Sequence, residues 1–365
     1  MVPVPSAQQI RFCRSRDGVS IAYASTGDGP VLVKAANWVT HLDHDFDSVV
    51  WRHWLAALGH RRTLIRYDAR GCGLGQRNDV DFSFDKYVED LEAVVDAAAP
   101  ERFALFGFAG GGATAVAYAA RHPSRVTQLV LYGAFVRGRF ARSRTTAQLE
   151  EEETLLRLIE IGWGRDDPSF RQLFVSQFLP EANPAQIRSF NALMRQTTSP
   201  ANAAALMRAW FAADVSRFAP LVRCPTLVLH PRDAIRVPFE EGRELAGLIP
   251  GARLVPLESA NLILLEEEKA WQSLVGEIDA FLSDGREPAT AGSPGVDLEI
   301  LTARERDVLE LVARGMDNDS IARQLGITTK TARNHVSAIL GKLDLHNRAQ
   351  VIVRAREAGI GIRGR

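Results

Sequence analysis

The sequence predicts an α/β fold, a mainly parallel eight-stranded sheet with intervening helices, followed by a small all-α domain. Three observations support this prediction. Strand-like runs alternate with helical segments over residues 11–282. Residues 284–297 are rich in Gly, Pro, Ala and Ser, and after them only helical periodicity is present. The length of 365 residues also exceeds what one hydrophobic core usually serves.

Runs of apolar and β-branched residues predict the strands. From the third run onward they alternate with helical segments such as residues 87–98, which is typical of a doubly wound sheet. Residues 135–219 differ, because they show helical periodicity, many aromatic residues and no strand. The predicted strands are 11–14, 19–24, 31–35, 63–67, 103–106, 127–132, 226–230 and 253–257.

Composition and charge restrict the class of protein. With 46% hydrophobic and 24% charged residues the composition is typical of soluble proteins, so we expect a cytoplasmic protein without a membrane span or signal peptide. The three cysteines are widely spaced, which favours buried thiols and predicts no metal or cofactor. Residues 320–365 contain nine basic and two acidic residues although the whole chain is neutral. This uneven distribution indicates a polyanionic partner.

The segment 103–121 has the pattern of a nucleophile elbow, a buried strand followed by a glycine-flanked turn and an alanine-rich helix. In the pattern G-x-S-x-G the central serine lies in a strained turn between small residues. Ala109 occupies the place of that serine, between Gly107 and Gly111. The turn is therefore expected without its nucleophile.

On these residues the first domain resembles the α/β-hydrolase family, specifically the bacterial subgroup fused to a LuxR-type DNA-binding domain. The sequence DARGCG at residues 68–73 resembles a turn of the family as well. The family's acid lies in a D-x-x-V-P pattern, where counting back from Val237 gives Ala234. The family's histidine lies in N-H-x-L-L-E, where Leu262 stands here. The resemblance therefore implies that all three triad positions are lost and that the domain is not an enzyme.

Two alternatives remain open. The first is an active hydrolase with a triad of other residues, since Asp233 lies one residue from the acid's position and His230 ends a late strand. The second is that the hydrolase-like domain only dimerises the chain and binds nothing. A cavity beneath the helical insertion would argue against this second alternative.

A catalytically inactive hydrolase domain can still bind a small molecule. In the family, the insertion 135–219 is a cap over the active-site cavity, and we expect about a third of its aromatic residues to line that cavity. Backbone amides of Gly110 and of the loop 36–38 are expected to survive as hydrogen-bond donors. His41 is either a polar anchor or a loop contact. The expected ligand-binding residues are Asn37, Trp38, His41, Phe108, Ala109, Gly110, Ala234, Ile235 and Leu262.

The segment 301–359 resembles the LuxR-type helix-turn-helix domain. Thr302 and Glu305 form a T-x-x-E capping box at the start of a helix that Gly315 ends. A second helix over residues 319–325 precedes Gly326. Thr328 is expected to cap a third helix over about 330–343, with apolar positions Ala332, Val336, Ile339, Leu340 and Leu343 towards the core.

The resemblance implies that the third helix enters the major groove of double-stranded DNA. Arg333, Asn334 and Ser337 are expected to meet base edges, since arginine and asparagine can each bond one base at two points. The helix 348–358 is expected to form a homodimer on DNA. Lys330 belongs to the same exposed face, and phosphate contacts are expected from Thr331, Lys342 and Arg348.

These interpretations combine into one prediction. Residues 1–283 form a ligand-binding hydrolase-like domain, residues 284–297 a linker, and residues 298–365 a DNA-binding domain. The chain is expected to be a transcription regulator that senses a small, largely apolar metabolite.

Overall fold

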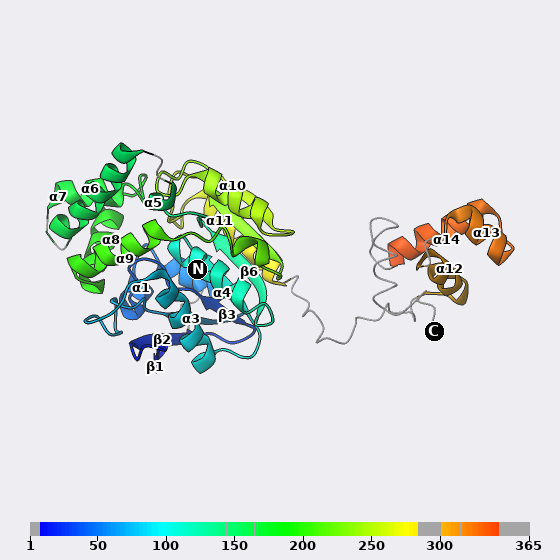
Figure 1. The fold of residues 1–365 in the computed structure, drawn as a ribbon, viewed down its shortest axis with the longest axis horizontal. Coiled ribbons are helices and arrows are strands. Elements are labelled where there is room, and N and C mark those ends of the chain that lie inside the picture. Colours follow the sequence, from blue (N-terminus) through cyan, green and yellow to red (C-terminus); the bar gives the residue numbers. More distant parts are fainter. Residues whose placement is uncertain are drawn as a thin grey trace. The chain divides into compact units, whose positions relative to one another are not determined.

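A computed structural model gives the fold and describes residues 8–142, 145–163, 165, 167–283, 301–313 and 316–342. The chain divides into two compact units, Met1–Gly285 and Arg286–Arg365 (Figure 1). Each unit has its own hydrophobic core. The expected linker, residues 284–297, lies outside the described residues, so it remains a prediction.

The first unit contains the predicted eight-stranded sheet, in the order β1-β2-β4-β3-β5-β6-β7-β8. Strand β2 is antiparallel to both β1 and β4, and every later pairing is parallel. Each strand lies within two residues of its predicted ends. The bounds are β1 Gln9–Arg14, β2 Ser20–Thr26, β3 Val31–Lys34, β4 Thr63–Tyr67, β5 Phe103–Phe108, β6 Val126–Tyr132, β7 Thr226–Pro231 and β8 Arg253–Leu257.

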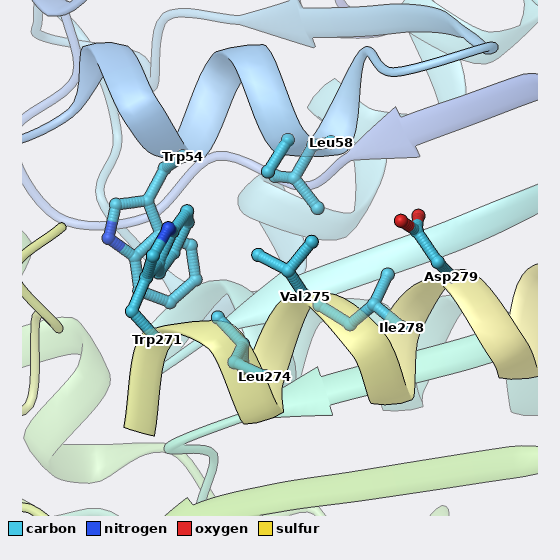
Figure 2. Close-up of a pocket in the computed structure, with 8 residues that line it drawn as sticks. Trp54, Leu58, Trp271, Leu274, Val275, Ile278 and Asp279 are labelled. Carbon is cyan, nitrogen blue, oxygen red and sulfur yellow. The ribbon is translucent and has the colours of Figure 1, made fainter. Parts of the chain in front are cut away.

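Two groups of helices cover the sheet. Helices α3 and α4 pack side by side, and α10 packs against β7. Helix α11 lies along α2, as Figure 2 shows. The bounds are α1 Leu42–Asp47, α2 Arg52–Leu58, α3 Phe84–Ala98, α4 Gly110–Arg121, α10 Phe239–Leu248 and α11 Lys269–Ser283.

The chain between β6 and β7 forms the predicted helical insertion, drawn in green in Figure 1. Asp167, Asn183 and Ser199 each accept amide hydrogen bonds at a helix start, and a proline follows each of them. These residues set the starts of α7, α8 and α9 because proline suits the first helical position. The bounds are α5 Arg139–Arg142, α6 Thr146–Gly162, α7 Pro168–Val175, α8 Pro184–Thr197, α9 Pro200–Ala212 and the 3-10 turn η1 Ala219–Leu221.

The second unit contains α12 Ala303–Ala313, α13 Asn318–Leu325 and α14 Thr329–Lys342. The predicted capping box is present, with the Thr302 amide donating to Glu305 Oε2 at 2.7 Å and the Glu305 amide donating to Thr302 Oγ1 at 3.3 Å. Gly326 ends α13 in the left-handed conformation with φ 64°. Gly315 and the helix 348–358 lie outside the described residues.

The turn after β4 is held by a hydrogen bond and by close packing. Asp68 accepts a bond from the Leu74 amide at 2.8 Å, and a Cβ on Gly73 would lie 2.1 Å from Asp68 Oδ2. Arg70 in this turn is fully buried and donates two bonds to Asp90 of α3, at 2.8 and 2.6 Å. The two-pronged ion pair therefore ties the turn to α3.

We expect Arg70→Met to lower the free energy of unfolding of the first unit by about 3–5 kcal/mol, because it leaves the Asp90 carboxylate buried without its partner. All six tryptophans belong to this unit, so urea unfolding followed by tryptophan fluorescence measures it in the full chain. Arg157→Met is the control, since the Arg157 side chain is 74% exposed and its pair with Glu160 is solvated. Equal losses in both variants would contradict the assignment.

Candidate functional site

The elbow between β5 and α4 is a strained turn centred on Ala109. Ala109 has φ 46° and ψ −116°, a conformation that residues with a Cβ rarely adopt. Its amide donates to the Tyr132 carbonyl at 2.9 Å, and its carbonyl accepts from the Gly112 amide at 2.9 Å. Gly110 then opens α4, where an amide has no intrahelical acceptor. The Gly110 amide, which the sequence predicts as a hydrogen-bond donor to a ligand, therefore has no acceptor within α4.

Close backbone packing explains the glycines of this turn. A Cβ on Gly107 would lie 2.6 Å from Gly112 Cα, and one on Gly111 would lie 2.7 Å from the Ala36 carbonyl oxygen. A Cβ on Gly110 would lie 2.4 Å from the indole of Trp210 in α9. The elbow therefore contacts the loop after β3 and the helical insertion at once.

The loop after β3 is held by buried polar contacts. Asn37 accepts a hydrogen bond from the buried Lys34 ammonium and donates to the Trp38 carbonyl. His41 caps α1 by accepting from the His44 amide, and burial followed by the neighbouring His44 lowers the pKa of His41 to about 4. His41 was expected either to anchor a polar group of the ligand or to make a contact within the loop. Its bond to the His44 amide supports the contact within the loop. Trp38 donates from Nε1 to the Ala203 carbonyl of α9 at 3.3 Å.

The loop after β7 consists of turns and bends that bury some of its side chains and expose others. Ala234 and Arg236 are buried, whereas Asp233 and Ile235 are exposed. Ile235 is 67% exposed and lies outside the cavity wall, so it differs from the expectation of a ligand contact. His230 is fully buried and bonds the Val237 carbonyl through Nε2 at 2.9 Å.

The loop after β8 places Leu262 against the end of β6. A Cβ on Gly133 would lie 2.6 Å from Leu262 Cδ1, and the Leu262 amide donates to the Phe178 carbonyl of the insertion at 2.9 Å. The carbonyl of Leu264 accepts bonds from His53 Nε2 at 2.9 Å and Trp54 Nε1 at 3.0 Å. Helix α2 thus holds this loop in place.

These segments line an open cavity of about 450 Å³, a volume that includes its mouth. Of the nine expected ligand residues, Trp38, Ala109, Gly110 and Leu262 line it. Asn37, His41, Phe108 and Ala234 are buried outside its wall. The complete lining is Trp38, Ala109, Gly110, Phe135, Gly138, Arg139, Arg142, Phe178, Met207, Trp210, Phe211, Arg236, Val237 and Leu262.

Three arginines of this wall were missed by the sequence interpretation. Arg139 and Arg142 belong to α5, and Arg236 belongs to the loop after β7. No local sequence pattern marks Arg236, because its burial depends on Gln177 and Met207 of the distant insertion. The cavity is therefore apolar with a cationic part.

A second hollow lies between α2 and α11 (Figure 2). Trp54 and Leu58 line it from one helix, and Trp271 and Leu274 from the other. Asp279 at its edge already pairs with Arg62 at 2.6 Å. The hollow is smaller, about 210 Å³, and its apolar walls are the packing surface of two helices.

Helix α14 presents the predicted polar face. Arg333, Asn334 and Ser337 are exposed, whereas Ala332, Val336 and Ile339 are buried. Lys330 is exposed too, and Thr331 is half-buried with its amide bonded to Thr328 Oγ1 at 3.2 Å. The cap predicted at Thr328 and the buried stripe are confirmed; Leu343 and Arg348 lie outside the described residues.

Lys342 has a contact that the sequence interpretation did not include. Its ammonium lies 2.7 Å from Glu305 Oε2, so the end of α14 is tied to the capping box of α12. Hydrogen bonds from Lys342 and Thr302 lower the pKa of Glu305 to about 2. A phosphate contact by Lys342 would have to compete with this ion pair.

Within the described ranges, no group of three or more His, Cys, Asp and Glu side chains is placed to hold a metal ion. No helix among the described residues is both long and apolar enough to cross a bilayer.

Two family models match the chain. The model of the α/β hydrolase fold matches residues 44–268, and that of bacterial regulatory proteins of the luxR family matches residues 299–355. Over the first unit the chain is 26% identical to the pyrrolizixenacetamide deacetylase of Xenorhabdus hominickii, across 67% of this chain and 89% of that protein. Over 59 residues it is 49% identical to the transcriptional regulatory protein DesR of Bacillus subtilis, across 16% of this chain and 30% of DesR.

Solved structures agree with this division. A hydrolase from Pseudomonas aeruginosa superposes with a TM-score of 0.62 at 24% identity, covering 76% of this chain and 99% of that one. An esterase from Rhodococcus sp. gives 0.61 at 25% identity, covering 75% and 98%. The chain belongs to the α/β hydrolase fold family and carries, fused to that domain, a LuxR-type DNA-binding regulator domain.

Proposed function

We propose that this protein is a ligand-responsive transcription regulator whose hydrolase-fold domain binds a small metabolite and no longer hydrolyses one. The observation that carries the proposal is the wall of the cavity. It contains the elbow residue Ala109 and Leu262, the residue that the sequence places at the position of the family's histidine. Among the described lining residues there is no Ser, Thr, Cys, His, Asp or Glu, so the wall offers neither a nucleophile nor a general base.

An active hydrolase with other catalytic residues is the main alternative, and the names of the deacetylase and esterase relatives favour it. His230 and Asp233 are its candidates. The His230 ring bonds a backbone carbonyl and is fully buried outside the cavity wall, and the Asp233 side chain is exposed. Neither residue lines the cavity, which counts against a base and an acid at this site.

A domain that only dimerises the chain is the other alternative. The cavity argues against it, because a purely structural domain gains nothing by leaving such a space unfilled. A homodimer on DNA remains part of the proposal, since the family's DNA-binding domain is small and two-fold operators pair two copies.

In the DNA-binding unit, we assign base contacts to Arg333, Asn334 and Ser337. Their exposure on one face of α14 supports this assignment, and none of the described residues accepts a hydrogen bond from the Arg333 guanidinium. An arginine that the fold does not use can bond guanine at two points. Lys330 and Thr331 lie near the start of the same helix and are assigned to phosphates.

The catalytic part of the proposal is tested by rebuilding the triad. Wild-type protein should show no turnover of p-nitrophenyl acetate, whereas the triple variant Ala109→Ser, Ala234→Asp, Leu262→His should become acylated at residue 109. Mass spectrometry of the intact protein after mixing with the ester detects the added acyl group. Ala109→Ser alone is the matched control and should remain almost unmodified, because the three residues act as a unit. Turnover by the wild type would overturn the proposal.

Ligand binding beside the elbow is tested by filling the cavity. Ala109→Trp should abolish any change in operator affinity that the low-molecular-mass fraction of a cell extract causes in the wild type, because the indole occupies the ligand's space. Fluorescence anisotropy with a labelled operator selected from random DNA measures the affinity. The control is Ala97→Trp on the exposed face of α3, which should retain the response. A response that persists in Ala109→Trp would place the ligand elsewhere.

The DNA assignment separates two cations of α14. Arg333→Ala should weaken binding to the selected operator by roughly 1–3 kcal/mol and relax the preference at one base pair, with little loss of stability. Lys342→Met should instead loosen the unit, because it removes the ion pair with Glu305. Hydrogen–deuterium exchange of α12 and α14 measures that loosening. Faster exchange in Arg333→Ala than in Lys342→Met would contradict both assignments.

A further inference from the structure

Arg236 is a buried cation at the wall of the cavity. The residue is 5% exposed, and its guanidinium lies over the rings of Phe178 and Phe211, 5.4 and 5.0 Å from their centroids. It donates from Nη1 to Gln177 Oε1 at 2.9 Å and from Nη2 to Met207 Sδ at 2.8 Å. These partners are an uncharged amide and a thioether, which is a weak acceptor.

The neighbouring arginines differ because each has a carboxylate. Arg139 pairs with Glu152 at 2.6 Å, and Arg142 lies 3.5 Å from Glu241. Among the described residues no carboxylate lies within ion-pair distance of Arg236. The three guanidinium groups of this wall thus have two carboxylate partners, Glu152 and Glu241, and neither of these pairs with Arg236.

A buried charge without a counterion is expensive, and folded proteins keep one where a ligand supplies the opposite charge. Burial, followed by the nearby Arg139, lowers the pKa of Arg236 to about 9, so the side chain is still charged at neutral pH. The planar guanidinium fork matches the two oxygens of a carboxylate. Apart from Arg139, Arg142 and Met207, the remaining wall is formed by aromatic and aliphatic residues and glycines.

From these contacts we infer that the cavity binds a small monocarboxylic acid with an apolar body, and that Arg236 holds its carboxylate. This inference rests on the proposed ligand-binding function and specifies its ligand class. The apolar body lies against Trp38, Trp210 and Leu262. A phosphate monoester fits less well, because its second negative charge would have to displace Glu152 or Glu241 from the arginines that they already neutralise.

The test compares acids with their uncharged amides in the full chain. Isothermal titration calorimetry at neutral pH with octanoate and octanamide, and with phenylacetate and phenylacetamide, measures the preference. We expect at least one acid to bind about tenfold or more tightly than its amide, as a charge-assisted pair would give. Arg236→Met should abolish this preference and leave the affinity for the amide nearly unchanged.

Arg232→Met is the matched control, because Arg232 lies in the same loop, is exposed, and pairs with the exposed Glu258 at 2.7 Å. This variant should keep the wild-type preference. Thermal unfolding without any probe adds a second readout: Arg236→Met should unfold at the same or a higher temperature than the wild type, since it removes an uncompensated buried charge. An arginine with only a structural role would give a lower unfolding temperature.

The outcomes separate this inference from the proposed function. If neither acid binds more tightly than its amide, or if the preference survives in Arg236→Met, the inference is wrong. If acids bind through Arg236 but do not change operator affinity, the carboxylate site stands and the regulatory proposal fails. If operator affinity responds to an extract from which carboxylic acids have been removed, regulation stands and the carboxylate assignment fails.

Discussion

The left-handed turn at Ala109 is the constraint on which the rest of the site depends. A residue with a Cβ at φ 46° is strained, and the surrounding contacts must hold it there. Gly107 and Gly112 meet in close backbone contact, and Gly111 lies against the carbonyl of Ala36. Because this packing joins β5, α4 and the loop after β3, the turn keeps the shape of a catalytic elbow although its side chain is a methyl group.

The proposed loss of catalysis is compatible with the packing of this fold. Leu262, which the sequence places at the position of the family's histidine, packs on Gly133 without needing a hydrogen-bond partner. Ala234, which the sequence places at the position of the family's acid, likewise buries a methyl group where a carboxylate would need a partner. Arg236, two residues further along the same loop, places a positive charge at the cavity wall. A buried cation at this wall would suit recognition of an anion better than proton transfer, which is consistent with the proposed binding function.

Much of the fold could be predicted from the sequence, because it depends on local patterns. The strands are continuous apolar runs, and the capping box of Thr302 and Glu305 and the stop at Gly326 follow from local hydrogen bonding and backbone conformation. The buried stripe of α14 follows from helical periodicity. Ala109 could be placed because the elbow pattern is local as well.

The details of the cavity wall could not be predicted in the same way. Which residues of the loop 231–238 face inward depends on its pairing with the loop after β8, where the Asp233 amide bonds the Ser259 carbonyl at 3.1 Å. In this loop Ile235 is exposed, whereas Arg236 is buried against Gln177 and Met207 of the insertion. Asn37 and His41 were expected at the ligand, but their polar atoms are used by Lys34 and by the start of α1. Residues distant in the sequence determine these side-chain orientations, so no local sequence pattern predicts them.

The position of Arg236 also indicates what a ligand would change. Its side chain comes from the sheet domain, yet Gln177, Met207, Phe178 and Phe211, which hold its guanidinium, belong to the insertion. A carboxylate bound there would neutralise the charge that these residues surround, and would therefore stabilise the arrangement in which the insertion closes on the sheet. A ligand shifts a conformational equilibrium only by its difference in affinity between two states. If the proposed ligand binds, the contact between the insertion and the loop after β7 is the element whose equilibrium it would bias, and regulation of DNA binding would start there.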